Sequence, residues 1–196
     1  MAANKLVFRK TIIAGTGLFL CLFLIVHLSA NWILLLPEET ARELYNSYAT
    51  TLRENLFIKS ISYILYAFIV LHVIYALLIT IHNRKAKPQK YVVNHFLQNS
   101  TWTSQNMGLI GTMILLFIVV HLANFWARVK LGMGEIIELD ATGNLDVYEV
   151  TFSLFHNIYY VIFYTVLMIP LGLHLNHSKF QANLLWMPLS ILSVFS

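Results

Sequence analysis

Four long apolar runs constrain the fold of this chain more than any other feature. They cover residues 11–36, 57–81, 107–129 and 152–175. Each is long enough to cross a bilayer, which takes roughly 20 apolar residues in a helix. A fifth run, 184–195, has only 12 residues and is too short to cross alone. We therefore predict an all-α membrane protein: one five-helix transmembrane bundle over residues 1–196, with a short or incomplete fifth helix.

The composition indicates that lipid is the main solvent. Hydrophobic residues make up 58% of the chain and charged residues 11%, against about 25% charged in an ordinary soluble domain. The first run is longer than the roughly 7–15 apolar residues of a signal-peptide core, so we expect it to be retained as a span. The single cysteine, Cys21, excludes an internal disulfide, and the lack of a CxxCH motif excludes covalent c-type haem.

The charged residues predict which side each loop faces. All nine acidic residues lie within 37–56 and 130–149, whereas the N-terminus and residues 83–104 carry seven basic residues and no acid. Because excess Lys and Arg marks the cytoplasmic side, we predict a cytoplasmic N-terminus in a bacterial inner membrane. The net charge of +4 then reflects a basic inner face. We expect an anionic membrane surface or a soluble partner there, and no nucleic acid.

One histidine lies inside each of the four long runs. These residues are His27, His72, His121 and His174. An ionisable residue within a membrane span is rare and is a functional hypothesis by default. Helix rise places His27 and His121 roughly 24–25 Å from the inner surface, His72 roughly 18 Å from it, and His174 shallower. We predict that His27 pairs with His121 toward the outer side, and His72 with His174 toward the inner side.

Two neutral imidazoles that face each other suit the iron of a haem held from both sides. We therefore predict two b haems, with the four histidines as ligands to the iron. A histidine hydrogen-bonded to a neighbouring helix is the main alternative, and zinc or copper would need its ligands clustered at one depth. The remaining histidines are expected at interfaces or in solvent. They are His82, His95, His156 and His177.

Polar residues near the ends of the spans are candidates for contacts with haem propionates through charge-assisted hydrogen bonds. They are Asn31, Arg84, Lys85, Trp102, Ser104 and Arg128. Arg and Lys at such positions also extend to the interface as anchors, and Trp is typical of the aromatic belt. The residues by themselves leave both roles open.

Several motifs, taken together, are similar to one family of membrane proteins. Val26-His27-Leu28-Ser29 is followed by Asn31, and His72 is followed by Asn83-Arg84-Lys85-Ala86-Lys87-Pro88. The segments 100–107 and 117–126 continue the similarity at the two ends of the third run. Across residues 10–175, the chain resembles the cytochrome b558-type membrane anchor of succinate dehydrogenase and fumarate reductase.

The resemblance implies a five-helix anchor with two b haems, whose four ligands correspond to the four histidines above. It implies that a flavoprotein subunit and an iron–sulfur subunit dock on the cytoplasmic face. It also implies electron transfer between the iron–sulfur subunit and a membrane quinone, typically menaquinone, as the non-catalytic subunit of a succinate:quinone oxidoreductase. Related anchors use an acidic residue near the second span for quinone proton transfer. Glu54 stands at a similar place and would serve as general acid or base.

The chain departs from the family pattern after its fourth histidine. Leu175 runs directly into Asn176-His177-Ser178-Lys179, without the second His and the Gly-Phe-Gln-Ser stretch of the family. Two other functions stay open: a b-type haem anchor of another respiratory dehydrogenase, and a haem-free structural membrane anchor. A small transporter is disfavoured, because no repeated half is visible.

Overall fold

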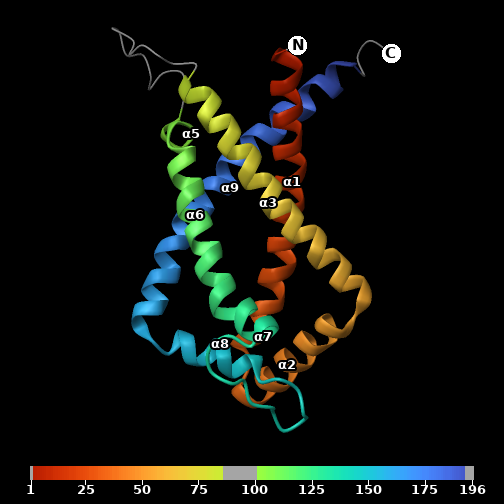
Figure 1. Cartoon of the computed structure of the whole chain (residues 1–196), viewed down its shortest axis with the longest axis vertical. Helices are drawn as coiled ribbons and strands as arrows, with labels where there is room; N and C mark the ends of the chain where they lie inside the picture. The colour runs from red at the N-terminus through yellow and green to blue at the C-terminus, as the bar shows by residue number, and fades with distance from the viewer. Residues whose placement is uncertain (1, 86–100, 193–196) are drawn as a thin grey trace.

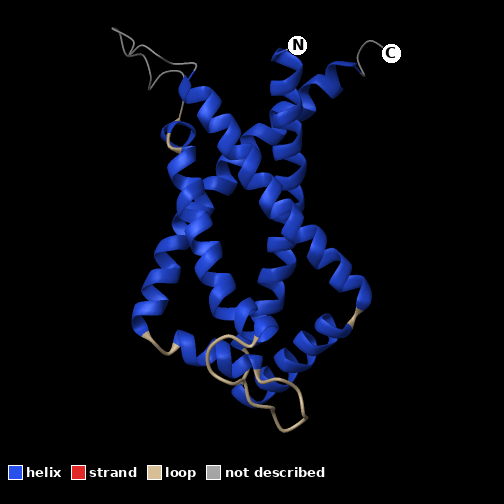
Figure 2. Cartoon of the chain, viewed as in Figure 1, coloured by secondary structure: helices blue, strands red, loops and turns tan. Residues whose placement is uncertain are grey.

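The computed structural model describes the backbone of residues 2–85 and 101–192, and the side chains of 7–85 and 101–177. The described chain is almost entirely helical (Figure 2). Its elements are α1 (Ala2–Asn31), η1 (Trp32–Leu35), α2 (Glu38–Glu54), α3 (Leu56–Lys85), α5 (Trp102–Gln105), α6 (Met107–His121), η2 (Leu122–Ala127), α7 (Arg128–Leu131), α8 (Val147–Phe155) and α9 (Ile158–Leu192).

Four helical stretches among the described residues are long and apolar enough to cross a membrane. They are Val7–Leu35, Leu56–Lys85, Met107–Leu131 and Ile158–His177. The expectation of a separate fifth helix is not met in this part of the chain, because residues 184–192 continue α9. Residues 176–183 contain neither proline nor glycine, so nothing local ends the helix there.

The fourth span begins later than the run 152–175 predicted. Residues 152–155 belong to α8, a short helix whose first turn is capped by the Asp146 carboxylate, which accepts a hydrogen bond from the Glu149 N–H at 3.1 Å. The Asn157 side chain then accepts from the Tyr159 N–H at 2.9 Å and starts α9. In both caps, a side-chain oxygen accepts a hydrogen bond from a backbone N–H at the start of a helix. Hydropathy alone does not detect such caps.

The four spans form two closely packed pairs, α1 with α3 and α6 with α9, whereas contacts between the two pairs are sparse (Figure 1). α2 and α8 lie across one end of the bundle, and the start of α1 and the end of α9 lie at the other end. The first of these ends is called the acidic end here, because α2, the 132–146 loop and α8 carry all nine acidic residues. The other is called the basic end. The structure thus places both acidic segments at one end of the bundle.

A polar network joins α2 to α8 at the acidic end. Arg42 pairs with Asp146 and, at 2.7 Å, with Glu149, and its guanidinium lies 5.0 Å from the centre of the Tyr148 ring. Asn46 has no exposed surface. Its amide donates to Asp146 at 3.0 Å, and its carbonyl oxygen accepts from the Tyr148 N–H at 2.8 Å. The network therefore connects two segments that are about a hundred residues apart in the chain.

Candidate functional site

His27 and His121 form one pair of facing rings, which we call the acidic-end pair. His27 comes from α1 and His121 from the last residue of α6. Their ring centroids are 5.8 Å apart and their planes are 89° to one another. Phe23 stacks on His27 at 5.3 Å, and Phe117 stacks on His121 at 5.6 Å. These aromatic rings surround the pair with apolar surface.

His72 and His174 form the second pair, the basic-end pair. They come from α3 and α9, with ring centroids 6.1 Å apart and an interplanar angle of 74°. Thr16 of α1 contacts His72, with its Oγ1 3.0 Å from His72 Nδ1. Next to it, a Cβ added at Gly17 would lie 3.3 Å from His72 Cε1. A glycine at this position therefore allows the imidazole to approach the α1 backbone.

The members of each pair lie at matching depths. His72 and His174 each stand 16 residues after the first residue of their helices, or roughly 24 Å from the acidic end. His27 and His121 stand 8 and 10 residues before the ends of their spans, or roughly 12–15 Å from that end. His174 lies beside His72 rather than shallower than it, and Lys179, from which the sequence estimate was counted, lies within α9 and not at its end.

Each histidine pair connects the two packed helix pairs. α1 and α3 pack together, as do α6 and α9, and each imidazole pair takes one ring from each of these units. Helices within lipid gain little from apolar contact alone and need close packing or polar contacts to associate. The histidine pairs therefore add ring contacts between two units that otherwise touch little.

The spacing within both pairs suits a metal between the rings. A metal–nitrogen bond of about 2 Å, together with roughly 1 Å from nitrogen to ring centre, puts two imidazoles on one metal about 6 Å apart. The Nδ1 atoms of His121 and His174 are buried and have no hydrogen-bond partner. Buried polar groups are normally hydrogen-bonded, so the chain itself does not fix which ring nitrogen carries the hydrogen in these two residues.

The number of possible protein ligands at each pair indicates which kind of metal group it could hold. In the part of the chain that the structure describes, no three His, Cys, Asp or Glu side chains gather as a metal-binding group. A zinc site takes at least three protein ligands. Haem needs only two axial histidines, because the porphyrin supplies the other four nitrogens. Two histidines per site and aromatic neighbours therefore fit haem better than a bare ion.

Two of the candidate propionate residues lie toward the acidic end. The Asn31 amide donates to the carbonyl of His27 at 2.7 Å, so it completes its own helix, and its oxygen accepts from the Tyr45 hydroxyl at 3.4 Å. Arg128 is largely buried and lies 3.7 Å from Glu135, and its Nε has no hydrogen-bond partner. Of the two, Arg128 keeps the capacity to bind an anion.

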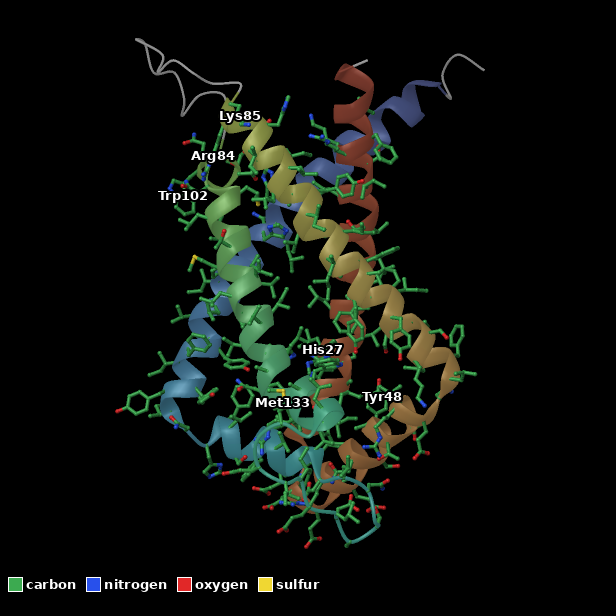
Figure 3. All side chains as sticks on the ribbon, in the orientation of Figure 1. His27, Tyr48, Arg84, Lys85, Trp102 and Met133 are labelled. Atoms are coloured by element: carbon green, nitrogen blue, oxygen red, sulfur yellow. The ribbon has the colours of Figure 1, made fainter. Side chains whose placement is uncertain are left out.

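The other four candidates lie together at the basic end. Figure 3 shows Arg84, Lys85 and Trp102 there, far from Tyr48 and Met133. Arg84, Lys85, Trp102 and Ser104 are exposed. The backbone N–H of Ser104 donates to the Thr101 side chain at 3.3 Å, which caps α5. The structure therefore groups these four residues but brings none of them into a recorded contact with a paired histidine.

Glu54 is the last residue of α2 and is exposed at the acidic end. No recorded contact joins it to either histidine pair. His82 and His156 are exposed, whereas His177 lies within α9 rather than in the polar turn that the sequence suggested. His95 lies outside the described residues.

Thr16, which contacts His72, was not predicted from the sequence. The signal was weak, because a threonine inside a span normally bonds to the carbonyl four residues earlier and needs no other partner. Its position beside Gly17, on a helix that also carries a paired histidine, is the only local indication of a further role.

Comparisons of the chain with protein-family models, with curated proteins and with solved structures found no match. The resemblance to the cytochrome b558-type anchors therefore rests on the sequence motifs alone.

Proposed function

We propose that this chain is a dihaem cytochrome b that anchors a succinate:quinone oxidoreductase in the inner membrane. One observation supports the proposal: two pairs of imidazole rings lie at two depths of the bundle. In each pair the ring centres are about 6 Å apart, and each pair joins the two helix units. Incidental histidines would have no reason to face one another twice at matching depths.

Each of the two histidine pairs would bind one haem. His27 and His121 would hold the haem nearer the acidic end, and His72 and His174 the haem nearer the basic end. When bound, the haems supply one-electron transfer across the bundle. The aromatic rings of Phe23, Phe117 and Phe125, which lies 5.0 Å from His121, would line the first site with apolar surface. Arg128, with its unbonded Nε, would neutralise a propionate.

The two ends of the bundle fit different partners. The basic end carries Arg9, Lys10, Arg84 and Lys85, which supports a cytoplasmic location by the positive-inside rule. The iron–sulfur and flavoprotein subunits would dock on this face. Menaquinone or another membrane quinone would exchange electrons with the chain, and Glu54 remains the candidate for the proton transfer that accompanies quinone chemistry.

The test is a pyridine haemochrome assay on the complex purified with its partner subunits. We expect two b haems per chain, falling to one in His27→Ala and to one in His174→Ala. His156→Ala, which alters an exposed histidine, is the matched control and should retain both. A chain without haem would contradict the proposal and favour a structural anchor. Two haems without succinate:quinone activity would point to another respiratory dehydrogenase.

A further inference from the structure

Thr16 is buried against α3, where its side chain meets His72. Only 5% of its surface is exposed, and its Oγ1 lies 3.0 Å from Nδ1 of the histidine. The same oxygen lies 2.7 Å from the carbonyl oxygen of Ile12 and 3.2 Å from that of Ile13. The hydroxyl thus has three neighbours but a single hydrogen to donate.

The distances decide where that hydrogen goes. Two oxygen atoms 2.7 Å apart require a hydrogen between them, and the Ile12 carbonyl can only accept. The Thr16 hydroxyl therefore donates to Ile12 and presents a lone pair to His72. A contact of 3.0 Å to that lone pair is favourable only if Nδ1 of His72 carries a hydrogen and donates it. A neutral imidazole carries one N–H, so Nε2 is left with a free lone pair.

We propose that Thr16 is a positioning residue that holds His72 as the Nδ1–H tautomer, with Nε2 presented as a metal ligand. The identity of the metal as haem iron rests on the proposed function, but the assignment of the tautomer does not. Gly17 completes the arrangement, since the imidazole comes so close to its backbone that a Cβ would lie 3.3 Å from Cε1. Thr16 thus contacts one ring nitrogen, and the absence of a Cβ at Gly17 leaves room for the edge of the ring.

The arrangement makes the two ligands of the basic-end pair unequal. His72 has a hydrogen-bond acceptor for Nδ1, whereas Nδ1 of His174 is buried without one. A hydrogen bond from the distal nitrogen fixes the orientation of a ligating histidine and raises its basicity, and loss of such a partner typically weakens metal binding about 10–100-fold. A more basic ligand favours ferric iron, so the Thr16 contact should lower the reduction potential of this haem.

The test compares three variants of the full chain in its complex. Thr16→Val keeps the shape but removes the hydroxyl acceptor, leaving the Ile13 carbonyl as the other acceptor beside His72, and Thr16→Ser restores the hydroxyl. Thr11→Val is the matched control, since Thr11 bonds only to the Val7 carbonyl of the same helix and is exposed. We expect Thr16→Val to raise the potential of one haem and to weaken its retention about 10–100-fold. The other haem should not change, and Thr16→Ser and Thr11→Val should match the unaltered chain.

Two results would overturn the proposal: unchanged potential and haem retention in Thr16→Val, or an equal change in both haems. A failure of the proposed function is recognised separately, as an unaltered chain that binds no haem. In that case the tautomer is read by ¹⁵N NMR of histidine-labelled full-length chain in micelles, with His72→Ala used for assignment. We expect the Nδ1–H form in the unaltered chain and its loss in Thr16→Val. An Nε2–H form in the unaltered chain would refute the role of Thr16.

Discussion

The imidazole planes of His27 and His121 are 89° to one another, although the two rings lie on different helices and only 5.8 Å apart. The orientation follows from the aromatic side chains around them. Phe23 is nearly parallel to His27, at 18°, and Phe117 lies at 29° to His121. Each imidazole thus takes its plane from a phenylalanine four residues earlier in its own helix. The packing within the two helices, rather than the pair itself, sets the crossed arrangement.

Crossed ligand planes predict a spectroscopic signature for the proposed haems. With perpendicular imidazoles, the two iron orbitals that bond to the ligand π-systems remain nearly equal in energy. We therefore expect a strongly anisotropic low-spin ferric signal in electron paramagnetic resonance spectra of the oxidised complex. His27→Ala should remove one such component. A purely rhombic signal, typical of parallel imidazoles, would contradict the observed ring geometry.

Gly17→Ala should disturb the basic-end pair. The added Cβ would lie 3.3 Å from Cε1 of His72, so the ring must move by a few tenths of an ångström, and such overpacking costs about 1–3 kcal/mol. We expect weaker retention of one haem, measured by haemochrome assay after detergent washing. Gly15→Ala is the control on the same helix, because its Cβ would meet nothing within 4 Å. Equal haem loss in both variants would assign the effect to the helix rather than to His72.

Asn46→Ala should loosen the acidic end. It removes the acceptor of the Tyr148 N–H and two amide contacts, to Asp140 and Asp146. A buried group left without its partner costs about 1–3 kcal/mol. We expect a lower thermal unfolding temperature in micelles and faster protease cleavage within 132–146. Ser47→Ala, an exposed change on the same helix, should have neither effect, and a normal cleavage rate in Asn46→Ala would refute the role of the network.

The acidic end should also lose stability in strong acid. The Thr142 hydroxyl, with further hydrogen bonds from Asn46 and from the backbone of Asn144 and Thr142, lowers the pKa of Asp140 from 3.8 to about 2. A carboxyl whose pKa is lower in the folded state stabilises the fold above its unfolded pKa, and this contribution fades as the pH falls from about 4 to about 2. The measurement is protease cleavage within 132–146 as a function of pH. Asp140→Asn should remove this part of the pH dependence, and an unchanged profile would contradict it.

Cysteine labelling tests the predicted orientation. In a Cys21→Ser background, Ser47→Cys places a thiol on an exposed position of α2 at the acidic end, and Lys85→Cys places one at the basic end. We expect a membrane-impermeant maleimide added to intact spheroplasts to label position 47 and not position 85, because excess basic residues mark the cytoplasmic side. The reverse pattern would place the N-terminus outside.

Hydropathy was sufficient to locate the spans but not all of their boundaries. A run of apolar residues in lipid has to satisfy its backbone within the helix, so the four spans follow from local sequence. The start of the fourth span was misplaced by six residues, at 152 instead of Ile158, because residues 152–155 belong to α8 and the Asn157 cap starts a new helix after it. The fifth span was predicted from a 12-residue run that, over the described residues, only extends α9.

The sequence by itself determined the helical state of the chain, the separation of acidic from basic ends, and the four intramembrane histidines. Each of these depends on residue type and spacing within one segment. The tertiary structure alone decided that α1 packs on α3 and α6 on α9, that Asn46 joins the two acidic segments, and that Thr16 bonds to His72. These contacts join residues 56 to 102 positions apart, and in lipid they depend on shape and single polar groups rather than on hydrophobicity, which all four spans share.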